Sequence, residues 1–211
     1  VIRDGTSVST LTKAEISEDR IIRDMVGRDM AHRYPDRALN PGEMLFEVDG
    51  WSCWHPEQAG RQMIKGVSLN VRKGEIVGIA GLMGTGRTEL AMSIFGRSYG
   101  KGHRGEVRMG GRPVDISTVT KAIDAGISYV TEDRKALGLI LEEPILKNIS
   151  LANLMGIAKR SVLDKRREAQ VAEGYRKQLA IRTPGVQQKV VNLSGGNQQK
   201  VVLSKWLFTD P

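Results

Sequence analysis

Hydrophobic positions beyond residue 43 follow strand and helix periodicities in turn. Residues 45–48 and 67–71 alternate between apolar and polar side chains, which predicts half-buried strands. Residues 75–80 are almost continuously apolar, as in a strand that is covered on both faces. Residues 87–95 then show helical spacing. The pattern predicts an α/β core.

The same alternation continues for a further stretch. Residues 105–109 predict a strand that ends in a hairpin turn at Gly110-Gly111. Ser117 is expected to cap a short helix, and residues 127–130 predict another short buried strand.

Beyond residue 144 the spacing becomes helical. Asp164 is a predicted helix N-cap, and Val171, Tyr175 and Leu179 follow it on one face. A last helix is predicted from about residue 195 to 208. The sequence therefore predicts a helical subdomain of about residues 140–200 after the α/β core.

Residues 1–43 have a different pattern. Residues 1–5 predict the end of a strand running into a turn, and Thr12 and Glu15 have the spacing of a capping box. An apolar stripe continues to about residue 30, and Pro35 and Pro41 predict a linker. One helix and a strand end bury little surface, so we expect this segment to pack on something absent from this chain.

Composition narrows the class of protein without identifying it. The 211 residues are 40% hydrophobic and 27% charged, as in ordinary globular proteins. No apolar stretch approaches the roughly 20 residues that span a bilayer, and we expect no signal peptide. A single cysteine excludes an internal disulfide and suits a reducing cytosol.

The net charge of +8 allows a nucleic-acid or anionic-membrane partner. The basic residues are scattered, however, and few aromatic residues stand among them, which favours a merely solubilising role. We therefore predict no nucleic-acid partner.

Residues 81–88, Gly-Leu-Met-Gly-Thr-Gly-Arg-Thr, have the spacing of a phosphate-binding loop between a predicted strand and a predicted helix. Glycines let backbone N–H groups approach phosphate closely at the positive end of the helix. Arg87 stands where Lys is usual, and its bulky planar guanidinium predicts a degenerate site. The alternative is a glycine-rich turn without a ligand. The predicted nucleotide-binding residues of this loop are Gly81, Gly84, Thr85, Gly86, Arg87, Thr88 and Glu89.

Residues 193–200, Leu-Ser-Gly-Gly-Asn-Gln-Gln-Lys, predict a second anion-binding helix start. Ser194 is an expected N-cap, and two glycines expose the first N–H groups. The alternative is a capped helix with a purely structural role. The predicted nucleotide-binding residues here are Ser194, Gly195, Gly196, Asn197 and Gln198.

These motifs resemble those of one family, the ABC ATPases. Residues 193–200 are similar to the family's signature motif, in the variant typical of monosaccharide importers. Residues 81–89 resemble the phosphate loop of the second nucleotide-binding domain of the same ATPases, where Arg is common, and residues 129–139 match them as well. Residues 1–34 resemble the end of their first cassette, with Asp4-Gly5 and Tyr34-Pro35 in the expected order. The likeness covers essentially the whole chain.

The resemblance implies a P-loop NTPase fold with an antiparallel β subdomain and an α-helical subdomain. Residues 1–43 would be the C-terminal tail of a first nucleotide-binding domain plus a linker. Residues 44–211 would be most of a second domain, truncated before the Walker B strand. Since the family's catalytic Glu and switch His follow that point, no catalytic residue is expected within the chain. His32, His55 and His103 are expected to be ordinary loop histidines.

The resemblance also implies a mechanism. Each ATP lies between the phosphate loop of one domain and the signature of the other, so Ser194 would act on the γ-phosphate held by the first domain. Thr88 and Glu132, which stands at the start of the Q-loop, are the predicted Mg²⁺ ligands; the alternative for Glu132 is an exposed charged loop. Trp51 or Trp54 would stack on adenine, or else pack in the core.

The implied cofactors are ATP and Mg²⁺. The implied partners are transmembrane permease subunits, against which residues 132–154 would lie, and the first nucleotide-binding domain or a second copy. A periplasmic sugar-binding protein would act indirectly. The protein would be peripheral, at the cytoplasmic face of the bacterial inner membrane. Alternatives are a soluble ABC ATPase of translation or DNA repair, a P-loop enzyme outside this family, or a regulatory nucleotide-binding module.

Overall fold

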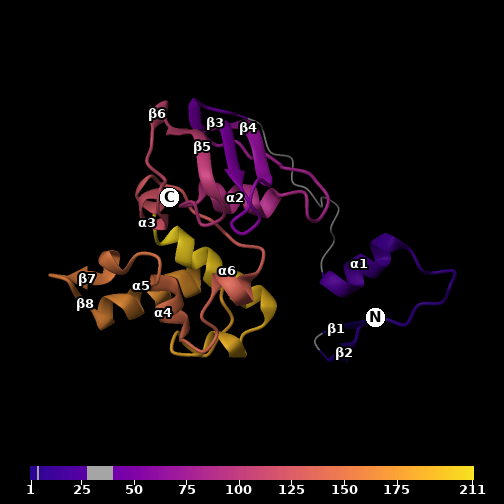
Figure 1. Ribbon diagram of the computed structural model, residues 1–211. Coiled ribbons are helices and arrows are strands. Elements are labelled where there is room, and N and C mark those ends of the chain that lie inside the picture. Colours follow the sequence, from indigo (N-terminus) through magenta and orange to yellow (C-terminus); the bar gives the residue numbers. More distant parts are fainter. Residues whose placement is uncertain (4, 28–39) are drawn as a thin grey trace. The chain divides into compact units, whose positions relative to one another are not determined.

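The computed structural model describes residues 1–3, 5–27 and 40–211. Two compact units, Val1–Asn40 and Pro41–Pro211, make up the chain, and each is described by itself (Figure 1). Within the described residues, no helix has the length and apolar character needed to cross a membrane.

The first unit is a short hairpin followed by a helix. Strands β1 (Ile2–Arg3) and β2 (Thr6–Ser7) pair antiparallel, as the predicted strand end and turn require. Helix α1 (Glu18–Val26) starts at Ser17, whose Oγ accepts a hydrogen bond from the backbone N–H of Arg20.

The predicted helix start at Thr12 is wrong. Thr12 does bond the Glu15 carboxylate, through its N–H at 2.9 Å, but this capping-box pair closes a turn before the helix. Gly27 ends α1 with a left-handed φ of 80°. The rest of the predicted stripe and most of the linker, together with His32, Tyr34-Pro35 and Asp4, lie outside the described residues.

The second unit opens with the predicted antiparallel β subdomain. One sheet holds four strands in the order β4-β3-β5-β6. Gly110 and Gly111 form the predicted tight turn, with φ values of 55° and 75° that suit glycine. The strands are β3 (Met44–Trp54), β4 (Gln62–Arg72), β5 (Lys101–Met109) and β6 (Arg112–Pro113).

One face of this sheet packs on helix α2 (Arg87–Ile94), close to its predicted bounds. Trp51 is 1% exposed, and its Nε1 donates a 2.9 Å hydrogen bond to Ser93 Oγ on α2. Val48 and Leu90 belong to the same apolar cluster. The sheet therefore fixes α2, and with it the loop that precedes α2.

Helix α3 (Val119–Asp124) follows the sheet. Its cap is Thr118, whose Oγ1 accepts from the Lys121 N–H, and not Ser117 as predicted. The N–H of Ser117 instead binds the Asp115 carboxylate in the turn before the helix.

The predicted buried strands at residues 75–80 and 127–130 are absent from the described structure. Ile76 is 82% exposed, and Val77, Ile79 and Val130 are exposed as well. A strand needs a hydrogen-bonded neighbour for its N–H and C=O groups, and neither segment pairs with a described strand. An apolar run predicts a preference for burial, but it cannot supply the neighbouring strand.

The remainder of the unit is largely helical, as predicted, and its helices lie side by side in Figure 1. Asp164 caps α5 as expected, accepting from the N–H groups of Arg166 and Arg167 at 2.9 and 3.1 Å. A small hairpin, β7–β8, was not predicted. The elements are η1 (Arg134–Gly138), α4 (Ile145–Ser150), η2 (Leu154–Ile157), β7 (Ala158–Lys159), β8 (Val162–Leu163), α5 (Lys165–Gln178), η3 (Val190–Asn192) and α6 (Gly195–Leu207).

Helices α4, α5 and α6 share a second apolar cluster. Ile149 and Val201 are fully buried in it, and the predicted face of α5 (Val171, Tyr175 and Leu179) packs against it. The buried Asn148 side chain holds the loop before α4, bonding both the N–H and the C=O of Ile140 at 2.8 and 2.9 Å.

Replacing Ile149 by Ala should therefore open a cavity between these helices. We expect Ile149→Ala to lower the free energy of unfolding by about 2–5 kcal/mol, measured by urea denaturation. Leu151, 44% exposed just beyond the same helix, provides the matched control, and Leu151→Ala should cost well under half as much. Equal losses would contradict the assignment of Ile149 to the core.

Candidate functional site

The loop of residues 81–86 has a glycine-dependent backbone. Gly84 and Gly86 have φ values of 80° and 94°, which residues with a side chain rarely adopt. Thr85 Oγ1 donates a 2.7 Å hydrogen bond to the Leu82 carbonyl, and a Cβ on Gly81 would come within 2.7 Å of that hydroxyl. The turn therefore needs glycine at these positions.

This loop presents unpaired N–H groups at the start of α2. Leu90 N–H is the first in the helix with a recorded acceptor, the Gly86 carbonyl at 2.8 Å. In the described part of the chain, the N–H groups of Arg87, Thr88 and Glu89 have no acceptor. Such a helix start is suited to an anion.

Two oxygens fit a magnesium ion beside the loop. Thr88 Oγ1 donates to Glu132 Oε2 at 3.4 Å. Adjacent ligands of an octahedral Mg²⁺ lie about 2.9 Å apart, so a small shift would let both oxygens bind one ion, with phosphate and water completing the shell. In the described residues there is no larger cluster of metal-ligating side chains. The pair thus fits a nucleotide-bound Mg²⁺ better than a closed protein site.

The second motif begins helix α6. Ser194 occupies the predicted N-cap position, but its Oγ accepts from Asn197 Nδ2 at 2.9 Å and makes no capping bond to the backbone. Gln198 N–H is the first with an acceptor, the Ser194 carbonyl at 2.9 Å. Within the described chain, the N–H groups of Gly195, Gly196 and Asn197 are therefore unpaired.

The side chains of Asn197 and Gln198 have partners inside the chain. Asn197 Oδ1 accepts the N–H of Arg182 at 2.9 Å. Gln198 is buried, and its Nε2 donates to the Val190 carbonyl at 3.2 Å while its Oε1 accepts from Arg134 Nε at 3.1 Å. Both residues shape the turn, and direct contact with nucleotide stays a prediction for each of them.

The structure keeps the two helix starts separate. No recorded hydrogen bond in the described chain joins residues 81–89 to residues 194–198. The nearest link runs through the segment after Glu132, because Glu132 touches Thr88 while Arg134 touches Gln198.

Two basic residues of this link were missed in the sequence. Arg134 lay inside the matched segment without an assigned role, and Lys205 lay within the last predicted helix. Lys205 is 7% exposed, and its Nζ donates to the Gly138 carbonyl at 2.7 Å and lies 4.8 Å from the Trp206 ring centre. A lysine on the apolar face of a helix is the one signal that could have indicated a buried contact.

The aromatic candidates for adenine stacking separate clearly. Trp51 is enclosed in the core, so its predicted stacking role is wrong and its alternative packing role is confirmed. Trp54 is only partly buried, with the Arg104 guanidinium 5.1 Å from its ring centre. Trp54 stays a candidate.

Of the two described histidines, His55 lies in a loop as expected, whereas His103 lies half-buried within strand β5, so the prediction of a loop position is wrong for it. His55 Nδ1 accepts the N–H groups of Glu57 and Gln58 at 3.1 and 3.0 Å and so closes a turn. His103 Nε2 lies 2.8 Å from the Tyr99 carbonyl.

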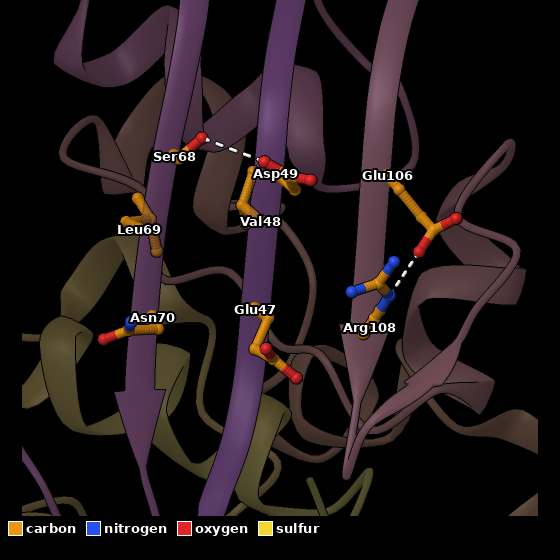
Figure 2. A pocket seen from close by; sticks show the side chains of 8 residues that line it. All are labelled: Glu47, Val48, Asp49, Ser68, Leu69, Asn70, Glu106 and Arg108. Carbon is orange, nitrogen blue, oxygen red and sulfur yellow. Dashed lines mark hydrogen bonds and ion pairs between the residues drawn. The ribbon is translucent and has the colours of Figure 1, made fainter.

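A polar hollow of about 330 Å³ lies on the β3–β4–β5 sheet, as Figure 2 shows. Its charged groups are partly paired, Ser68 Oγ with Asp49 at 3.3 Å and Arg108 with Glu106. No residue of either glycine motif lines it. The residues around it are Glu47, Val48, Asp49, Ser68, Leu69, Asn70, Glu106 and Arg108.

Comparison with known sequences agrees with the motifs. A sequence profile described as "ABC transporter" matches residues 64–211. The chain is 55% identical to the L-arabinose transport ATP-binding protein AraG of Geobacillus stearothermophilus. It is 45% identical to the xylose import ATP-binding protein XylG of Thermoanaerobacter pseudethanolicus and 43% identical to the ribose import ATP-binding protein RbsA of Clostridium perfringens. All of this chain aligns, but it spans only 42%, 42% and 40% of these relatives.

Solved structures show the same fold at low identity. The ADP conformation of MJ1267, an ATP-binding cassette of an ABC transporter, matches with a TM-score of 0.59 at 20% identity, over 80% of this chain and 66% of that one. The post-hydrolysis dimer of the cassette MJ0796, bound to ADP and Pi, matches with a TM-score of 0.61 at 21% identity, over 79% and 71%. The predicted cassette fold is confirmed, whereas the position of the Walker B strand stays a prediction.

The buried ammonium of Lys205 gives a test of its environment. Burial lowers the pKa of Lys205 below its ordinary value of 10.5. Between the lowered pKa and 10.5 the unfolded chain binds more protons, so the contribution of Lys205 to the free energy of unfolding should rise with pH in that window. Below the lowered pKa the contribution should be constant.

Urea denaturation of the wild type and of Lys205→Met at a series of pH values from 7 to about 10.5 measures this. The free energy of unfolding of the wild type minus that of Lys205→Met should increase as pH rises. Parallel pH profiles would show that Lys205 is solvated in the folded chain.

Proposed function

Since this chain belongs to the ABC transporter family, we propose that it is part of the ATP-binding subunit of a bacterial monosaccharide importer. Residues 1–43 would be the tail of a first nucleotide-binding domain with a linker, and residues 44–211 most of a second domain. The relatives named above, which carry the names of arabinose, xylose and ribose transport proteins, support this proposal.

The observation that carries the proposal is the pair of separate helix starts with unpaired N–H groups. One phosphate chain has no need of two such ends from the same domain. In a pairing of two domains, each end would serve a different ATP. The turn at Ser194 would then contact the γ-phosphate held by the first domain, and the loop at Gly84 and Gly86 would bind a second ATP.

The two sites would be unequal. Arg87 replaces the compact ammonium of Lys with a planar guanidinium, which meets the β- and γ-phosphates with different geometry. We propose that the loop at residues 81–89 binds nucleotide weakly and that the competent site is the one completed by Ser194. Thr88 and Glu132 would hold Mg²⁺, which would neutralise phosphate charge in the loop.

The proposed permease contact is supported by exposed apolar side chains. Leu137 is 59% exposed, and Ile140, Leu151 and Leu154 are exposed as well, on or beside the segment 132–154. Exposed apolar side chains are common at protein interfaces, so these four support a contact on this segment. Through this contact the protein would lie peripherally at the cytoplasmic face of the inner membrane, with a periplasmic sugar-binding protein acting from the other side.

Two other functions are compatible with the motifs. A soluble ABC ATPase of translation or DNA repair would share both motifs, and a regulatory module would bind ATP without turnover. The relatives with 43–55% identity are named as sugar transport proteins, which favours import. Copurification of the complete protein with a permease would support import, whereas copurification with ribosomes or DNA would support the first alternative.

The inequality of the sites predicts unequal effects of two substitutions in the complete subunit. We expect Ser194→Ala to lower ATP turnover about a hundredfold or more, because it alters the turn that faces the competent site. Arg87→Ala should lower turnover less than about fivefold, because it affects the weak site. Steady-state phosphate release measures both.

Ser204→Ala is a matched control for the loss of one hydroxyl, because Ser204 lies in the helix that Ser194 precedes and, among the described residues, its hydroxyl bonds only the Lys200 carbonyl. It should leave turnover nearly unchanged. Near-complete loss from both Ser194→Ala and Arg87→Ala would rule out the asymmetry.

The chain of 211 residues should not hydrolyse ATP by itself. In the family, the general base and the switch His belong to a segment beyond the signature helix, and the proposed role of Glu132 is to bind metal. We expect phosphate release at the background rate from purified 1–211. Turnover that is abolished by Thr88→Ala would refute this.

A further inference from the structure

The segment from Glu132 to Gly138 is fastened at three points. Its first residue contacts the phosphate loop through Thr88, at 3.4 Å. Arg134 contacts the start of α6, and the Gly138 carbonyl accepts from Lys205 near the other end of the same helix. The segment therefore links the two glycine motifs, which have no recorded hydrogen bond to each other in the described chain.

The Arg134 contact is geometrically fixed. Gln198 Nε2 donates to the Val190 carbonyl, so the other atom of the amide, Oε1, is the acceptor for Arg134 Nε at 3.1 Å. A Cβ on Gly195 would lie 2.8 Å from Arg134 Nη2. The guanidinium thus rests on Gly195, and the absence of a side chain there permits the contact.

The charge of Arg134 is not explained by pairing. In the described part of the chain no carboxylate lies within ion-pair distance of it. It stands beside the N–H groups at the positive end of α6, where a cation is electrostatically disfavoured. An exposed arginine would turn to water, but the buried Gln198 holds this one in place.

Lys205 holds the other end of the 132–138 segment, at Gly138. Its ammonium is almost fully buried and is bonded to the Gly138 carbonyl at 2.7 Å. Gly138 itself packs closely, since a Cβ there would lie 3.4 Å from Val202 on α6. Residues 134–138 should therefore move together with α6.

We propose that Arg134 is a positioning residue that couples the Thr88–Glu132 metal site of this chain to the turn at Gly195, which completes the opposite ATP site. With Mg²⁺ held between Thr88 Oγ1 and the Glu132 carboxylate, Glu132 would shift toward the ion and toward Thr88. Because Arg134 is two residues away and rests on Gly195, that movement would reorient the unpaired N–H groups of α6. The coupling is reciprocal, so ATP at the opposite site would alter Mg²⁺ affinity here. The inference rests on the proposed function.

The test is a double-mutant cycle on ATP turnover by the complete subunit, with variants Arg134→Met, Glu132→Gln and both. We expect Arg134→Met alone to lower kcat about tenfold and to change KM for ATP less than about twofold. In the Glu132→Gln background the same change should lower kcat less than about twofold, because the coupling is already lost. Tenfold losses in both backgrounds, or no loss in either, would overturn the proposal.

Lys135→Met is the matched control, since it removes a neighbouring exposed charge that has no recorded side-chain contact in the described chain. It should leave kcat unchanged, both in the wild type and in the Glu132→Gln background. Arg134→Lys keeps the charge but cannot both bond Gln198 and rest flat on Gly195, so it should stay close to Arg134→Met. Full rescue by Lys would overturn the fixed-geometry argument, and this conservative variant also serves if Arg134→Met does not fold.

Ser194→Ala in the same assay separates the two proposals. If Ser194→Ala retains full turnover, the proposed function fails. If Ser194→Ala is inactive and the Arg134–Glu132 cycle is strictly multiplicative, only the coupling fails.

Discussion

The constraint on which the rest of this structure depends is that a helix start leaves its first N–H groups without acceptors. In most helices a side chain or water satisfies them. Helix α2 instead follows Gly86, which has no side chain to cap it, and the Ser194 hydroxyl before α6 bonds the Asn197 side chain. Within the described residues, three N–H groups at each helix start therefore stay unpaired. The sheet under α2 and the apolar cluster under α6 hold these two starts in place.

Local chemistry allowed much of the fold to be predicted from the sequence. The Gly110-Gly111 turn, the Asp164 cap and the start of α6 each depend on a few adjacent residues, so periodicity and turn chemistry were sufficient. Ser117 and Thr12 show the limit of that reasoning. In each case another hydroxyl residue nearby in the sequence, Thr118 or Ser17, caps the helix instead, and the capping pattern alone does not distinguish between such candidates.

Residues 75–80 and 127–130 show a different limit. Their apolar composition predicts a buried strand, but a strand is a property of a pair of segments, and no described segment pairs with them. Ile76 and Ile79 consequently lie exposed. The glycine motifs were recognisable because each is contiguous in sequence, whereas the link between them depends on Arg134–Gln198 and Lys205–Gly138 contacts between residues more than sixty positions apart.

The link also gives a reason why a phosphate loop that binds nucleotide weakly, as proposed, would persist. A loop with Arg87 that only failed to hydrolyse ATP would serve no purpose, yet its proposed metal ligands, Thr88 and Glu132, are linked through Arg134 to the turn proposed to complete the other site. A degenerate site of this kind would act as a sensor, since binding there would change the opposite site without a reaction of its own. The residues that would carry this signal are then Gln198, whose side chain fixes the guanidinium, and Gly195, where the absence of a side chain leaves room for it.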